Sequence, residues 1–160
     1  MTYQDTIKKS MEMLAQDERT VFIGYGTLYG NRGYNTLTDI PEEKIIETPL
    51  AENLMMGLAI GMSFEGYIPV VFFERHDFLL VAADAIVNHM DKIGGLSKGQ
   101  FKTPLILRAV VGWNKPINLG PTHSQDFTKA FKEMVKFPIY EPGNSKEVLE
   151  TYQSLINSPR

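Results

Sequence analysis

The sequence predicts an α/β fold in three layers (α/β/α), with a mainly parallel sheet covered by helices on both faces. Short apolar segments alternate along the chain with longer segments whose apolar residues recur at helical spacing. The apolar segments lack the polar–apolar alternation of a strand with one exposed face, which indicates strands buried on both faces. A length of 160 residues, with 43% apolar and 22% charged side chains, suits a single domain over residues 1–160.

Short apolar runs predict the strands of this sheet. Each run ends at a glycine or proline or is followed by proline or a charged residue, as is typical where a strand ends. In chain order the predicted strands span residues 20–26, 44–48, 68–73, 104–112 and 137–142. Residues 68–73 (IPVVFF) contain no polar side chain, so we expect this strand to be fully buried.

Helices are predicted before, between and after these strands. In chain order they span residues 3–15, 49–64, 77–90, 124–134 and 145–156. The first helix places Ile7, Met11 and Leu14 near one face and is therefore amphipathic. Thr48 suits the N-cap of the second helix, and Pro49 suits its first position. Residues 27–43 are rich in glycine and asparagine and are expected to form a long polar loop.

The composition excludes several classes of protein. Without cysteine there is no disulfide framework, thiolate zinc site or iron–sulfur cluster. Sixteen Lys and Arg against nineteen Asp and Glu exclude a strongly basic nucleic-acid binder. His76, His89 and His123 do not have the spacing of metal ligands, so no metal site is expected. No signal peptide or membrane-spanning run is visible, and we expect a cytoplasmic protein with no nucleic-acid or membrane partner.

Glu52 is the first candidate for acid–base chemistry. It lies just after the predicted strand 44–48, and ligand sites of parallel sheets gather at the carboxyl ends of strands. In the first turn of the helix 49–64, its carboxylate also complements the helix dipole. Alternatively, a carboxylate at this junction exchanges a proton with a heterocyclic ring. The residues alone leave both interpretations open.

Polar residues also follow other predicted strands. The run Glu74–Asp77 (ERHD) is typical either of a site or of a solvated loop in which Asp77 caps a helix. The segment 122–125 (THSQ) brings His123 to a predicted helix start. Gly24–Gly26 (GYG) lacks the spacing of a dinucleotide fingerprint, and a turn that needs positive φ explains it better. Neither a phosphate-binding loop motif nor a Gly-Asp-Gly motif occurs in the sequence.

Longer runs carry a resemblance to a known family. They are IIETPLAENLMMGLAIGMSFEGYIPVVFF (45–73), DFLLVAADAIVNHMDKI (77–93), SKGQFKTPLILRAVVG (97–112) and THSQDF (122–127). In order and spacing these runs resemble the transketolase-like pyrimidine-binding domain, which has the thiamine-diphosphate-binding fold. They are most similar in pattern to β-subunits of the thiamine-diphosphate-dependent decarboxylase component of 2-oxo acid dehydrogenase complexes.

The resemblance implies a role for each matching residue. Glu52 matches the glutamate that bonds a ring nitrogen of the aminopyrimidine of thiamine diphosphate and so activates it. Phe78 matches the aromatic residue stacked on that ring, and Leu50 matches an apolar wall of the pocket. Glu74 occupies a position in the same pocket that is usually apolar. His123 matches the histidine of an H-S-Q segment on the substrate side, which makes Glu52 and His123 the expected catalytic residues.

The sequence also departs from the family. Tyr25 stands where an acidic residue is usual, and the loop 112–121 differs from the family's glycine-rich version. The family continues into a carboxyl-terminal domain that we expect to be absent here. Gly-Asp-Gly, which holds Mg²⁺ and the diphosphate in related domains, is missing, so a separate α-type pyrophosphate-binding subunit is expected to supply that half of the site.

The resemblance therefore implies a subunit that is inactive alone and acts on 2-oxo acids by decarboxylation and acyl transfer. The expected assembly is a heterotetramer with the α-type subunit, or a homodimer of the isolated chain. Gly57 and Gly61 predict that the helix 49–64 contacts another chain, although packing on the chain's own sheet explains them almost as well. Ketol transfer of the transketolase type, a non-catalytic binding or regulatory module, and an excised piece of a larger subunit remain alternatives.

Overall fold

The centre of the structure is a parallel β-sheet. A computed structural model describes residues 1–112 and 118–157, and this part of the chain contains a four-stranded sheet in the order β2-β1-β3-β4. The strands are β1 (Thr20–Gly24), β2 (Ile45–Glu47), β3 (Ile68–Phe73) and β4 (Ile106–Ala109). Every neighbouring pair runs parallel, which confirms the predicted α/β fold.

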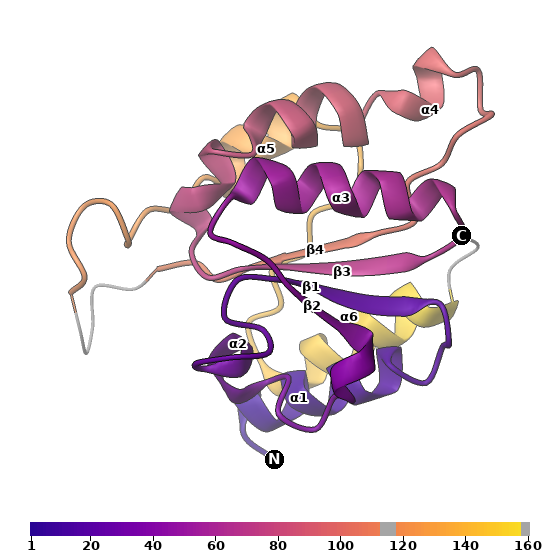
Figure 1. The fold of residues 1–160 in the computed structure, drawn as a ribbon. Helices are drawn as coiled ribbons and strands as arrows, with labels where there is room; N and C mark the ends of the chain where they lie inside the picture. The colour runs from indigo at the N-terminus through magenta and orange to yellow at the C-terminus, as the bar shows by residue number, and fades with distance from the viewer. Residues whose placement is uncertain (113–117, 158–160) are drawn as a thin grey trace.

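Helices cover both faces of the sheet (Figure 1). One face carries α3 (Glu52–Phe64), the 3₁₀-helix η2 (His76–Leu80), the π-helix η3 (Ala85–Met90) and α5 (Thr128–Met134). The other carries α1 (Tyr3–Leu14) and α6 (Ser145–Asn157). Shorter elements are α2 (Arg32–Asn35), η1 (Glu42–Lys44) and α4 (Ile93–Leu96).

The two faces of the sheet bury different side chains of the same strands. In β1, Ile23 packs towards α3 while Phe22 packs towards α1 and α6. In β3, Val71 packs towards α3 and Val70 packs towards α1 and α6, because successive side chains of a strand point to opposite faces. All residues of β1 and β3 are buried, which is why their sequences are continuously apolar apart from Thr20 and Gly24.

The strand register places the functional loops on one edge. Gly24 pairs with Glu47 of β2 and with Phe72 of β3, and Phe73 pairs with Ala109 of β4. The carboxyl ends of the four described strands therefore meet along one rim. The loops that leave this rim contain the polar segments singled out in the sequence.

Several predicted elements are wrong. Residues 137–142 form no strand; Pro138 has no N–H to donate to a ladder, and the Pro142 carbonyl accepts a hydrogen bond from Tyr3 instead. The single helix expected over 77–90 is divided into η2 and η3. The helix expected from residue 124 begins only at Thr128.

Side-chain hydrogen bonds explain the later start of the helix expected from residue 124. The side chains of His76 and Asp77 bond the segment 123–127 and do not cap η2. That segment in turn donates its N–H groups to these side chains, which keeps it out of the following helix. Asp126 Oδ1 accepts the N–H of Thr128, the first residue of α5, at 2.8 Å.

The loop after β1 contains a left-handed turn. Arg32, Gly33, Tyr34 and Asn35 have φ values of 46°, 60°, 56° and 60°. Left-handed conformations cost about 1–2 kcal/mol for each residue that is not glycine. Hydrogen bonds offset this cost: Gly33 N–H donates to the Gly26 carbonyl at 3.0 Å, and Tyr34 N–H donates to Asn31 Oδ1 at 2.9 Å.

The carboxylate of Glu47 fixes the start of this loop to the end of β2. It accepts the N–H groups of Gly26 at 2.6 Å, Thr27 at 2.9 Å and Leu28 at 2.7 Å. The Thr27 hydroxyl donates to the same carboxylate at 3.1 Å. Burial alone would raise the pKa of Glu47, but these hydrogen bonds outweigh it and hold the pKa below its usual value.

Replacing Glu47 by Gln is expected to lower the free energy of unfolding by about 1–3 kcal/mol, the usual range for hydrogen bonds to a charged group. An amide has one accepting oxygen in place of two, so some of the N–H groups lose their partner. The folded-state pKa of Glu47 is depressed, so its contribution is full above the unfolded-state pKa and is lost as the pH falls through the folded-state pKa.

Urea unfolding of wild type and E47Q at neutral pH and at a series of acidic pH values checks this. The difference between the two proteins should shrink as the pH falls. Glu43→Gln is the matched control, because Glu43 is an exposed carboxylate in the neighbouring η1. A difference that persists unchanged at acidic pH would show that the Glu47 carboxylate does not stabilise the loop through its charge.

Candidate active site at the carboxyl rim of the sheet

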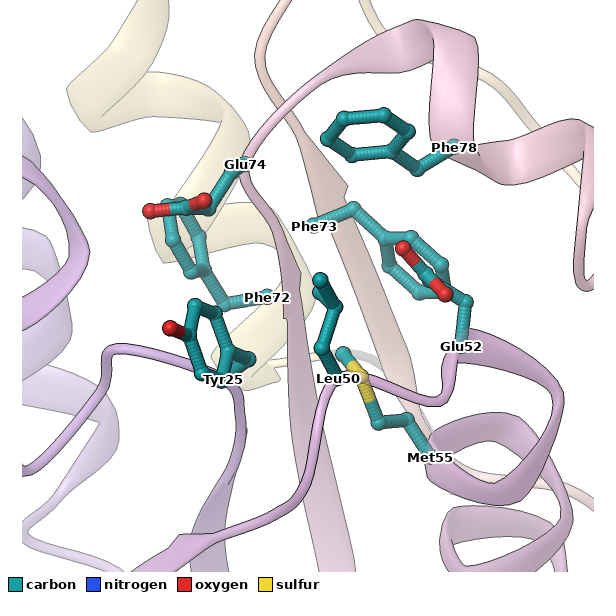
Figure 2. A pocket seen from close by; sticks show the side chains of 8 residues that line it. All are labelled: Tyr25, Leu50, Glu52, Met55, Phe72, Phe73, Glu74 and Phe78. Atoms are coloured by element: carbon teal, nitrogen blue, oxygen red, sulfur yellow. The ribbon is translucent and has the colours of Figure 1, made fainter.

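A pocket opens at the rim beside the ends of β1 and β3 and the start of α3. Figure 2 shows the side chains that line it: Tyr25, Leu50, Glu52, Met55, Phe72, Phe73, Glu74 and Phe78. The four residues that the family resemblance assigns to cofactor binding are among them, namely Leu50, Glu52, Glu74 and Phe78. Chain segments that are distant in sequence thus come together at one site.

Glu52 is a largely buried residue whose carboxylate has no partner. It is the first residue of α3 and is 8% exposed. Its carboxylate makes no hydrogen bond or ion pair with any residue that the structure describes. A carboxylate without a protein partner at a pocket is a candidate for contact with a ligand. Its position at the helix start also retains the favourable interaction with the helix dipole.

Phe78 and His123 meet beside the pocket. Their rings lie edge to face, with centroids 5.3 Å apart and planes at 87°. Thr122 Oγ1 lies 2.9 Å from His123 Nδ1. On the other side of the His123 backbone, a Cβ at Gly112 would collide with the His123 carbonyl oxygen, so the chain approaches closely there. His123 is thus next to a residue of the pocket wall, although it does not line the pocket itself.

Glu74 lines the pocket but directs its carboxylate elsewhere. Its Oε1 accepts the side-chain amide of Asn31 at 3.0 Å, and its backbone carbonyl accepts the Tyr34 hydroxyl at 3.2 Å. In Figure 2 the carboxylate points away from Glu52 and Phe78. A direct bond from Glu74 to a cofactor therefore stays a prediction, and its observed role is to bind the strained loop after β1.

The run Glu74–Asp77 is not a solvated loop, and Asp77 is not a helix cap. His76 and Asp77 are only 8% and 7% exposed. Their side chains bond the segment 123–127, an arrangement that the sequence analysis missed. The sequence does show hydrogen-bond donors in the run 123–127 (HSQDF) and acceptors in His76 and Asp77. It does not show that these two segments meet, because that depends on how the loops pack.

Other expectations concern metals, membranes and the loop 112–121. In residues 1–112 and 118–157, no group of three or more His, Asp or Glu side chains is placed to hold a metal ion. No helix within these ranges is both long and apolar enough to cross a membrane. Residues 113–117 of the divergent loop lie outside the described residues.

A parallel α/β sheet with an apolar pocket and an unpaired carboxylate at its carboxyl rim defines a cofactor- or substrate-binding domain. The comparison with known families gives the identity: the chain belongs to the family of the transketolase pyrimidine-binding domain, which matches residues 1–160. This confirms the family resemblance seen in the sequence.

Individual relatives agree with this assignment. The β-subunit of the pyruvate dehydrogenase E1 component from Chlorokybus atmophyticus is 32% identical over 163 residues, covering 92% of this chain and 45% of the relative. The mitochondrial β-subunit from Saccharomyces cerevisiae is 26% identical over 164 residues, covering 99% of this chain and 44% of the relative. The chain thus spans less than half the length of these relatives.

A solved structure shows the same fold. It is described as a split gene transketolase, an inactive β4 tetramer, and superposes with a TM-score of 0.73. The match covers 97% of this chain and 47% of the other, at 15% sequence identity. At that identity the likeness concerns the fold alone.

Replacing Glu52 by Gln is expected to lower the free energy of unfolding by no more than about 1 kcal/mol. The carboxylate bonds no group that the structure describes, so the change removes only its interaction with the helix dipole, worth about 0.3–1 kcal/mol. Thermal and urea unfolding of E52Q check this. Destabilisation by clearly more than about 1 kcal/mol would show that the carboxylate stabilises the fold beyond its helix-dipole interaction.

Proposed function

We propose that this chain is the pyrimidine-binding half of a thiamine-diphosphate-dependent enzyme that acts on 2-oxo acids by decarboxylation and acyl transfer. The proposal depends above all on Glu52, a largely buried residue whose unpartnered carboxylate lines a mainly apolar pocket. Membership of the pyrimidine-binding family and similarity to pyruvate dehydrogenase E1 β-subunits support the class of reaction.

The residues of the pocket fit an aminopyrimidine. Leu50, Met55 and Phe78 offer apolar surface to a flat ring, and Glu52 offers an acceptor that no described residue occupies. A ring N–H hydrogen bond would satisfy the carboxylate without exposing it to water. When bound, thiamine diphosphate supplies the reactive carbon and the electron sink for cleaving the bond next to a carbonyl.

Each residue of this chain then has a defined task. Glu52 holds a proton in a hydrogen bond with the ring nitrogen, which a carboxylate does better than an amide. Phe78 sets the plane of the ring by stacking, and the wall formed by Leu50 and Met55 limits access of water. His123, held against Phe78, is in place to give or take a proton on the substrate side.

A second subunit completes the site in this proposal. The sequence has no Gly-Asp-Gly motif, so we assign Mg²⁺ and the diphosphate to an α-type pyrophosphate-binding partner. The printed names of the relatives are those of β-subunits, and the structural neighbour is described as an inactive tetramer of β-subunits. We expect this chain to be inactive alone and active in a heterotetramer.

Two alternatives have some support. The structural neighbour's name favours ketol transfer of the transketolase type. Tyr25 and the engagement of Glu74 with Asn31 favour a non-catalytic module with the same fold. Assays of one reconstituted complex with 2-oxo acids and with ketose phosphates distinguish the proposed function from the first alternative. Activity on ketose phosphates alone would support ketol transfer. A complex that binds no thiamine diphosphate would support the second.

Binding of thiamine diphosphate with Mg²⁺, measured by calorimetry, is expected for the mixture of this chain with its partner and not for the chain alone. In that complex, Glu52→Gln should slow hydrogen–deuterium exchange at the thiazolium carbon by about 10²–10⁴-fold, because an amide cannot share the proton. Glu65→Gln is the matched control, an exposed glutamate after the same helix. Equal exchange rates in E52Q and wild type would refute the assignment of Glu52.

The exposed face of α3 supports self-association. A Cβ at Gly57 or Gly61 meets no atom within 4 Å, so neither glycine is required for packing on the chain's own sheet. Leu54, Leu58 and Phe64 are exposed on the same face. We propose that a second copy of this chain packs here, with the two glycines allowing the helices to approach closely.

Replacing Gly61 by Leu is expected to weaken this association while stabilising the monomer by up to about 1 kcal/mol through helix propensity. Sedimentation velocity over a range of concentrations checks the first effect, and urea unfolding of the monomer checks the second. Gln153→Leu is the control, since it adds a leucine at an exposed position of α6 on the opposite layer. Unchanged dimerisation in G61L would place the interface elsewhere.

A further inference from the structure

We infer that His76 and Asp77 are positioning residues for His123: they clasp the segment 123–127 so that the His123 imidazole stays against Phe78 at the pocket. The inference rests on the proposed function only in assigning His123 and Phe78 to the reaction. The clasp itself is a property of the chain and can be tested without cofactor or partner.

The first three residues of η2 contact the segment 123–127 in reverse chain order. His76 Nδ1 accepts the Phe127 N–H at 2.8 Å. Asp77 Oδ1 accepts the side-chain amide of Gln125 at 3.0 Å and its N–H at 3.4 Å. The next residue, Phe78, meets the ring of His123. Three consecutive residues of η2 thus contact alternate residues of an oppositely directed segment.

The clasp is anchored to the sheet. His76 N–H donates to the Val110 carbonyl at 2.8 Å, and Val110 N–H donates to the Phe73 carbonyl at 3.3 Å. The backbone of η2 is therefore held at the ends of β3 and β4. The His76 ring also stacks on Phe127, with centroids 6.3 Å apart and planes at 17°, and meets Phe131 of α5 edge to face.

Because His76 and Asp77 are buried, their hydrogen bonds favour one register of the segment 123–127. His76 and Asp77 are almost fully buried, and Asp77 Oδ2 has no hydrogen-bond partner among the described residues. Apolar side chains would fill the same space at lower desolvation cost. Polar groups aimed at particular N–H donors fix the register of the segment, which apolar packing alone would leave free to shift. We attribute their presence to the positioning of His123.

The protonation state of His76 controls the clasp. Nδ1 accepts a hydrogen bond only in the neutral ring, with the proton on Nε2. Burial lowers the pKa of His76, and the negative charges of Asp126, Asp77 and Glu141 offset only part of this. If Nδ1 were protonated, it could no longer accept the Phe127 N–H, and its own N–H would be attracted to Asp126 Oδ1, 3.7 Å away. The contact is therefore present at neutral pH and is lost as the pH falls through the lowered pKa.

Paired variants separate the clasp from simple packing. His76→Phe keeps a ring of similar size but removes the acceptor, whereas His76→Asn keeps an acceptor at the place of Nδ1. Asp77→Leu and Asp77→Asn form a second pair, which keeps the test decisive if H76F does not fold. His89→Asn is the control, because His89 is an exposed histidine on η3.

Proton NMR of the histidine rings of this chain gives the first readout. The sequence has only three histidines, so single variants assign every resonance. Ring current from Phe78 shifts the His123 signals, and Phe78→Ala defines the unshifted position. We expect H76F and D77L to move the His123 signals towards that position, while H76N, D77N and H89N do not. A folded H76F or D77L with unshifted His123 signals relative to wild type would overturn the inference.

Kinetics of the complex with the α-type partner give the second readout. H76F should lower kcat by about 10²-fold, the usual cost of a displacement of about 1 Å, with cofactor affinity unchanged. H76N should recover most of this loss. A folded H76F with normal kcat would also overturn the inference. A complex without any activity would instead refute the proposed function, while the NMR result would still decide whether the clasp exists.

Discussion

The parallel pairing of β1 with both β2 and β3 is the constraint on which the site depends. Parallel strands end on the same edge, so Gly24, Glu47 and Phe72 lie side by side in the register. The loops that follow these residues therefore converge on one rim. If β2 ran antiparallel to β3, Glu52, which follows β2, and Phe78, which follows β3, would lie at opposite ends of the sheet. Helices on both faces bury every residue of β1 and β3.

Glu47 and Glu52 lie in one short segment but differ in their contacts. Glu47 accepts several backbone N–H groups and stabilises a loop that contains left-handed residues. Glu52 is more deeply buried and has no partner among the described residues. A satisfied carboxylate stabilises the fold, whereas an unsatisfied one is retained at some cost where a ligand can bind it.

Local patterns predicted the elements that tertiary contacts leave undisturbed. The apolar run of β3 and the amphipathic pattern of α1 appear with the expected bounds or nearly so. Residues 137–142 are also largely apolar, yet proline and a hydrogen bond to Tyr3 keep them out of the sheet. The segment 77–90, expected as one helix, contains the 3₁₀-helix η2 and the π-helix η3, and His76 and Asp77 bond another segment. No local periodicity contains that information.

The sequence by itself determined the α/β class, because apolar patterning is a local property, and its motifs carried the resemblance to the family. That resemblance predicted Leu50, Glu52, Glu74 and Phe78 as cofactor-binding residues, and all four line the pocket. Only the tertiary structure decided what each polar side chain bonds. It turned Glu74 towards Asn31, left Glu52 without a partner, and joined His76 to the segment that carries His123. Hydrogen-bond partners far apart in sequence are chosen by how loops pack at the rim, and that choice has no local signature.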